Sequence, residues 1–135
     1  MADLAITAAN VVQGADAVVE DGWFGEAVTQ GQAVYRASDG KYYKADCDSA
    51  TAAVRSPRGL ALNAGSANQP ARVQTKGKIT IGATLTAGLA YYLSKTAGGL
   101  CPVADIAAGG YATIIGIATS TTELKINITE SGVAV

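Results

Sequence analysis

The chain has 135 residues, a length typical of one domain, and its 10 basic and 11 acidic residues give a net charge of −1. This balance excludes the strong positive field that steers proteins to nucleic acid or anionic membranes, so we expect neither as a partner. No stretch approaches the roughly 20 apolar residues of a membrane helix, and the first residues do not resemble a signal peptide.

Short alternating patterns along the chain favour β-strands over helices. Residues 4–12 predict an opening strand that ends at Gly14, and residues 17–20 predict a second that ends at Asp21-Gly22. Further strands are expected at 33–35, 41–45, 59–62, 71–74, 78–81, 89–93, 100–103, 113–119 and 124–128. About 8–11 short, mainly antiparallel strands indicate an all-β sandwich or barrel. We divide the chain into an extended N-terminal arm, residues 1–13, and one β domain, residues 14–135.

The chain repeats itself at a fixed offset. GEAVTQGQAVY is followed 57 residues later by GATLTAGLAYY. The residues shared by the two windows are Gly25, Thr29, Gly31, Ala33 and Tyr35 in the first and Gly82, Thr86, Gly88, Ala90 and Tyr92 in the second. Such self-similarity predicts one domain of two related halves, about 25–62 and 82–119, with matched turns and strands. We expect the two halves to cover each other about a pseudo-twofold axis.

Catalytic patterns are absent from the sequence. The chain has no histidine, which removes the commonest general base and metal ligand and makes Ser-His-Asp and Cys-His systems impossible. Cys47 and Cys101 have no CxxC spacing, so we expect two reduced thiols, with a disulfide as the alternative. We therefore expect no enzyme activity, no metal and no cofactor, and a function carried by surfaces.

Several residues are candidates for such a surface. Trp23 and Phe24, the only Trp and the only Phe, either fill the core or form an exposed anchor for a subunit or partner. Arg55 and Arg58 either lie in a solvated loop or pair with acidic groups of a larger assembly. The N-terminal arm can add as a strand to an exposed sheet edge. The candidate interface residues are Leu4, Ile6, Val11, Val12, Trp23, Phe24, Arg55 and Arg58.

A family resemblance rests on the order of these motifs. The repeated T-x-G-x-A-x-Y, the Asp39-Gly40 turn, Pro57-Arg58-Gly59-Leu60-Ala61, Gly116-Ile117-Ala118 and the opening Ala2-Asp-Leu-Ala-Ile resemble the capsid decoration, or cement, proteins of tailed bacteriophages. The resemblance covers about Leu4 to Val135.

The resemblance implies a small β-rich protein that is made in the bacterial cytoplasm and added in many copies to the outer surface of the phage head. There it would bind the major capsid protein and brace the capsid lattice against the pressure of packaged DNA. It also implies a homotrimer, less often a dimer, whose N-terminal arm reaches the shell or a neighbouring subunit. The family offers no catalytic residues.

Two other function classes stay open. A tail-fibre or baseplate adhesin module that binds a host surface would share the texture rich in glycine, threonine and alanine. A small β-barrel enzyme or ligand carrier would need a deep pocket lined by converging polar groups.

Overall fold

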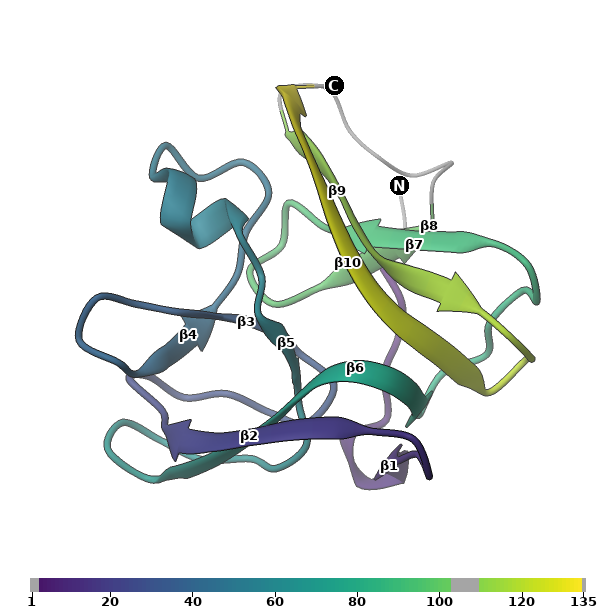
Figure 1. The fold of residues 1–135 in the computed structure, drawn as a ribbon, viewed down its shortest axis with the longest axis horizontal. Coiled ribbons are helices and arrows are strands. Elements are labelled where there is room, and N and C mark those ends of the chain that lie inside the picture. The colour runs from purple at the N-terminus through teal and green to yellow at the C-terminus, as the bar shows by residue number, and fades with distance from the viewer. Residues whose placement is uncertain (1–2, 103–109, 135) are drawn as a thin grey trace.

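The computed structural model describes residues 3–102 and 110–134, and it is all-β, as expected (Figure 1). Its strands form one curled antiparallel sheet, a half-barrel, in the order β4-β3-β5-β6-β10-β9-β7-β8, with β1 and β2 both paired to β6. The strands are β1 (Val11–Gln13), β2 (Val18–Trp23), β3 (Ala33–Arg36), β4 (Tyr42–Lys44), β5 (Gly59–Ala61), β6 (Pro70–Ile81), β7 (Ala90–Leu93), β8 (Leu100–Pro102), β9 (Tyr111–Ala118) and β10 (Glu123–Ala134). Two short 3-10 helices, η1 (Ala8–Asn10) and η2 (Ala52–Arg55), are the helical elements in the part described.

Strand β6 connects the two parts of the sheet. Its first part pairs with β2 along one edge and β5 along the other, and its last part pairs with β1 and β10. Between these parts Gly77 has a φ of 86°, a left-handed conformation that glycine adopts without steric cost. The strand therefore bends there without ending, and the two strands expected at 71–74 and 78–81 are one strand of 12 residues.

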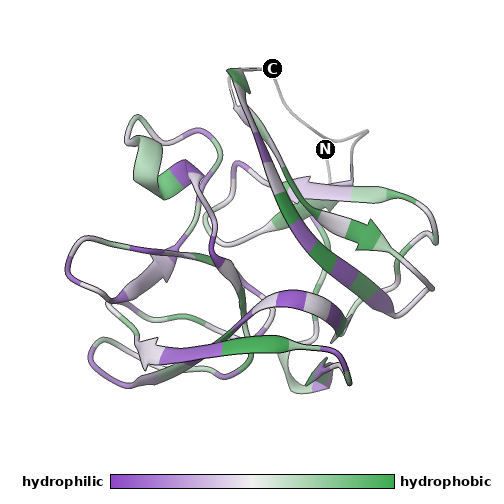
Figure 2. Cartoon of the chain, viewed as in Figure 1, coloured by the Kyte–Doolittle hydropathy of each residue, from purple (hydrophilic) through white to green (hydrophobic). Residues whose placement is uncertain are grey.

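Long-range pairing also changes the ends of other expected strands. The second strand runs through the expected turn at Asp21-Gly22 to Trp23, because β6 pairs with it along this length. The last strand extends to Ala134, and hydrophobic and hydrophilic residues alternate along its first half (Figure 2). Residue 103, expected to end the strand at 100–103, lies outside the described residues, as do residues 1–2 of the arm and residue 135.

The two repeated windows share a turn and the start of the following strand, but differ at their first residue, because Gly82 has a φ of 72° and Gly25 is not in the left-handed region. Each passes through a turn whose glycine, Gly31 or Gly88, has a positive φ of 86° or 84°, and enters β3 or β7 two residues later. The N–H groups of these glycines donate to the carbonyl oxygens of Ala61 and Ala118, at 2.8 and 2.7 Å. Matched hydrogen bonds at positions 57 residues apart support the duplication, which stays a hypothesis.

We expected the two halves to cover each other about a pseudo-twofold axis, but their burial is not symmetric. The larger core cluster contains residues of both halves, among them Leu60 of the first and Ala118 of the second. The other face of the first half is closed by a smaller cluster around Phe24 and Tyr42. Ile117 of the second half matches Leu60 and is 50% exposed, whereas Leu60 lies in the larger cluster. The segment after β2 supplies Phe24 and Val28 to the smaller cluster.

The N-terminal segment lies on the sheet of its own chain and does not extend away as the expected arm would. The N–H groups of Leu4 and Thr7 donate to the carbonyl oxygens of Leu100 and Gly82, both at 2.8 Å, and β1 pairs with the end of β6. Of the opening strand expected at 4–12, only residues 11 and 12 are in a strand, β1 (Val11–Gln13). Apolar side chains of this segment pack against the larger core, which explains why it does not stand free.

Candidate functional site

The eight candidate interface residues do not form a single surface. Leu4 and Ile6 pack against the larger core cluster, and Val11 belongs to it with 7% of its surface exposed. Gly31 makes room for this packing, because a side chain there would meet Ile6 at 2.9 Å and Val11 at 3.1 Å. Of the four candidates in the N-terminal segment, only Val12 is exposed.

Trp23 and Phe24 separate into the two roles that the sequence left open. Phe24 has no exposed surface and lies in the smaller core cluster with Tyr42 and Val34. Trp23, the last residue of β2, is 55% exposed and lies opposite Pro70 of β6. Successive strand residues point to opposite faces, so one aromatic residue fills the core and its neighbour meets solvent.

Three large apolar residues of the segment β1–β2 are exposed, Val12, Val18 and Trp23, and we call them the apolar strip. Their exposed fractions are 56%, 53% and 55%. Val18 and Trp23 are five residues apart on β2, so they point to opposite faces of that strand. Both strands pair with β6, and in the residues that the structure describes no strand pairs with their other edge. Val18 was missing from the sequence-based candidates, because Val18 and Val19 are adjacent apolar residues and the pattern does not indicate which of them meets solvent.

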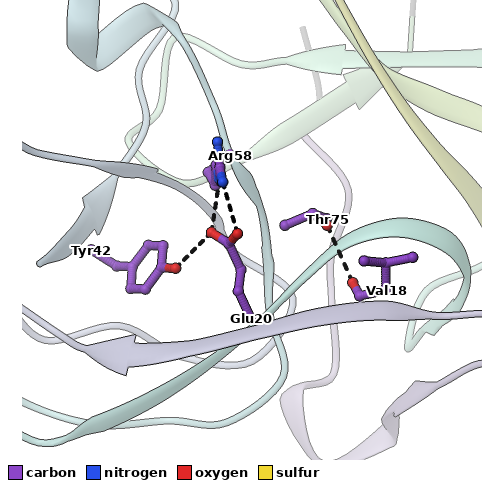
Figure 3. A network of polar contacts seen from close by, with 5 residues as sticks. All are labelled: Val18, Glu20, Tyr42, Arg58 and Thr75. Carbon is purple, nitrogen blue, oxygen red and sulfur yellow. Dashed lines mark hydrogen bonds and ion pairs between the residues drawn. The ribbon is translucent and has the colours of Figure 1, made fainter. Parts of the chain in front are cut away.

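A polar network joins β2, β4 and the segment before β5 (Figure 3). The Glu20 carboxylate accepts hydrogen bonds from Nε and Nη2 of Arg58, at 2.8 and 2.9 Å, and from the Tyr42 hydroxyl at 2.6 Å. The hydrogen bond from Arg58 holds the pKa of Glu20 below its ordinary value, and burial together with Glu20 raises the pKa of Tyr42 to about 12. Arg58 is therefore engaged by an acidic group of its own chain.

This network predicts a specific alkaline instability. Because the folded-state pKa of Tyr42 is about 12 and its ordinary value is 10.0, the stability held by the neutral phenol is present below pH 10 and is lost as the pH rises from 10 to 12. We expect urea unfolding of the wild-type protein to show this loss. The Tyr42→Phe variant should be less stable at pH 8 but show a smaller loss over that range. If the free energy of unfolding fell equally with pH in the two proteins, Tyr42 would not be the cause of the alkaline instability.

Arg55 is held by cation–π and hydrogen-bond contacts. Its guanidinium carbon lies 3.7 Å from the centroid of the Tyr111 ring, and its Nη1 donates to the carbonyl oxygen of Ser49 at 3.2 Å. These contacts connect η2 to β9. Both arginine candidates thus stabilise the fold, and neither is a freely extended cation.

The remaining repeat residues shape turns and packing. Thr29 and Thr86 are exposed, and each carbonyl oxygen accepts a hydrogen bond from the N–H three residues later. Gly25 lies against the Tyr43 ring, and Gly82 lies beside the backbone of Thr7. The ring of Tyr35 stacks on that of Tyr43 with centroids 5.9 Å apart, whereas Tyr92 is half-buried opposite Cys101. Ala33 is buried in β3 and Ala90 is half-buried in β7.

The described residues bring together little that resembles catalytic machinery. A groove of about 530 Å³ is lined by Glu20 and Arg58, which bind each other, and by Lys76 and Asn127, among others. Residues 3–102 and 110–134 contain no group of three potential metal ligands. Within the same ranges no helix is long and apolar enough to cross a membrane. Cys47 and Cys101 are buried without forming a disulfide, and burial raises the pKa of the Cys47 thiol to about 11.

Comparison with known proteins adds no relative: no family model and no curated protein matches this chain. The structure itself shows an all-β domain with an exposed apolar strip along an open strand edge.

Proposed function

We propose that this chain is a structural virion protein that binds the outside of an assembled phage head and stabilises the lattice of the major capsid protein. The observation that carries this proposal is the exposed apolar strip, Val12, Val18 and Trp23, along the open edge of β1–β2. The resemblance of the ordered, duplicated motifs to decoration proteins supplies the identity of the partner.

The strip has the properties of a protein-binding edge. An open strand edge can take a strand from another chain, whose main-chain hydrogen bonds give affinity while side chains give specificity. Three large apolar residues beside such an edge favour aggregation unless a partner covers them. Trp23 offers the kind of side chain that dominates the binding energy of many interfaces.

Self-association would strengthen a weak contact. We propose a homotrimer, with a dimer as the alternative, that engages several capsid subunits at once. Linked contacts of this kind raise the apparent affinity by about 10²–10⁴-fold without any new interaction. The protein would act through its surfaces alone, and we assign it no catalytic residue.

Binding to heads that lack this protein tests the proposal. The purified protein should co-sediment with undecorated heads at a fixed ratio to the major capsid protein. The Trp23→Ser variant should bind at least about tenfold more weakly, because an interface tryptophan typically contributes more than 1 kcal/mol. The matched control is Val133→Ser, which removes an apolar side chain that is 65% exposed on β10 and should bind like the wild type.

Three outcomes would contradict the proposal or the contact that it names. Binding to purified tails and not to heads would favour the adhesin alternative. Binding to neither particle would remove the virion role. Equal loss of binding in both variants would show that the strip along β1–β2 is not the contact.

A further inference from the structure

A row of four residues crosses the outer face of the second half. Lys78 of β6 lies opposite Lys125 of β10, Lys125 lies opposite Ile117 of β9, and Ile117 lies opposite Ala90 of β7. Both lysines are exposed, Ile117 is 50% exposed and Ala90 is half-buried. We call these four residues the lysine–isoleucine row.

The two lysines are unfavourable neighbours in the isolated chain. Like charges directly opposite each other on adjacent strands are destabilising. The ion pairs among the described residues are Arg58–Glu20 and Arg72–Asp21, so neither lysine takes part in one. Lys76, two residues before Lys78, adds a third exposed cation. Half of the chain's six lysines thus lie on or beside this face, although the whole chain has a net charge of −1.

Two carboxylates lie nearby. Glu123 is two residues before Lys125 on the same face of β10 and is diagonal to Lys78. Asp16 accepts a hydrogen bond from the backbone N–H of Lys78 at 2.9 Å, and this bond is the main reason that its pKa is lowered. The charges of Lys78 and Lys125 lower that pKa further, which places one carboxylate within reach of both cations. Asp16 is exposed, so solvent screens its effect on the two lysines.

The corresponding face of the first half is buried in the core. The residues at the matching positions are Ala33, Leu60 and Gln74, which are opposite one another on β3, β5 and β6. All three have no exposed surface, and Ala33 and Leu60 belong to the larger core cluster. The lysine–isoleucine row therefore occupies a face that is a packing surface in one half and open to solvent in the other.

We propose that the lysine–isoleucine row docks an acidic, extended segment of a partner protein. Carboxylates of the segment would lie over Lys78 and Lys125, and an apolar side chain would cover Ile117. Charge complementarity chooses this occupant, since acidic groups remove the repulsion that the isolated chain retains. The apolar half of the row favours protein over nucleic acid, whose phosphates require a wider basic field.

This surface adjoins the apolar strip, because Val18 lies opposite Lys76 and Val12 lies opposite Thr80. The inference does not depend on the capsid proposal. The probe is therefore a short synthetic peptide with glutamate at its first and third positions, valine at its fifth and serine between them, so that an extended conformation places both carboxylates and the apolar side chain on one face. The comparison peptide replaces every glutamate with glutamine. Backbone amide chemical shifts of the full chain, followed by NMR during titration, locate binding.

We expect shifts that cluster at residues 76–80, 116–118 and 123–126 with the glutamate peptide and are absent with the glutamine peptide. The K78Q/K125Q variant should bind about five- to tenfold more weakly, as two exposed charge contacts imply. The matched control, R36Q/K41Q, lowers the net charge equally at the other end of the molecule and should bind like the wild type.

A second readout separates binding from folding. Lys125→Glu creates an opposite-charge pair with Lys78, so the isolated protein should melt about 1–3 °C higher while peptide binding is lost. Shifts located elsewhere, or equal weakening in R36Q/K41Q, would overturn the proposal. Tighter binding of a DNA oligonucleotide to this face would also overturn it, in favour of a nucleic acid.

Discussion

Replacing Gly116 with alanine should destabilise the protein by about 3 kcal/mol, at the upper end of the range for overpacking. A side chain at this position of β9 would run into the backbone of Lys125 on β10, whose carbonyl carbon would lie only 2.9 Å from the new Cβ atom. Backbone cannot move aside as a flexible side chain does. The free energy of unfolding, measured by urea denaturation, tests this expectation.

Gly59, which matches Gly116 in the first half, also has no room for a side chain. A side chain at Gly59 would meet the backbone of Gln74, with the carbonyl carbon at 2.8 Å, so Gly59→Ala should have a similar effect. The control is Gly88→Ala, where no atom lies within 4 Å and only the φ of 84° disfavours alanine, by about 1–2 kcal/mol. If Gly116→Ala lost less stability than Gly88→Ala, the close strand packing described here would be wrong.

Replacing Phe24 with alanine should destabilise the protein by about 3–5 kcal/mol, the usual range for a fully buried phenylalanine. Phe24 has no exposed surface, and it closes the smaller core cluster between Tyr42 and the loop that contains Gly65. The melting temperature should fall by about 10 °C or more.

The neighbouring aromatic residue is the matched control. Trp23→Ala removes a larger but 55% exposed side chain and should change the free energy of unfolding by less than about 1 kcal/mol. Equal losses in the two variants, measured by thermal unfolding, would contradict the separation of core and surface at this pair.

Local patterns predicted the all-β fold class well, because the alternation of apolar and polar residues and the preferences of turn residues act over a few positions. The Asp39-Gly40 turn is an example: Gly40 has a φ of 81°, and Asp39 accepts a hydrogen bond from the N–H of Lys41. The strand ends at Trp23 and Ala134 were missed because each depends on a pairing partner far away in the sequence.

The candidate surfaces show the same limit of local reasoning. Exposure of Trp23 and burial of Phe24 follow from alternation, but which of the two faces inward depends on the position of β6. Leu4 and Ile6 were expected at an interface, and their cover by the chain's own core follows from packing that no local pattern encodes. The pairing of Lys78 with Lys125 joins strands 47 residues apart and has no signal in the sequence.

The most direct test of the proposed role is the disruption temperature of undecorated heads with and without this protein. Wild-type protein should bind at a fixed ratio and raise the temperature at which the heads release their DNA, and Trp23→Ser should raise it less at the same concentration. Heads that bind the protein but break at an unchanged temperature, or that do not bind it, would contradict a role in stabilising the capsid.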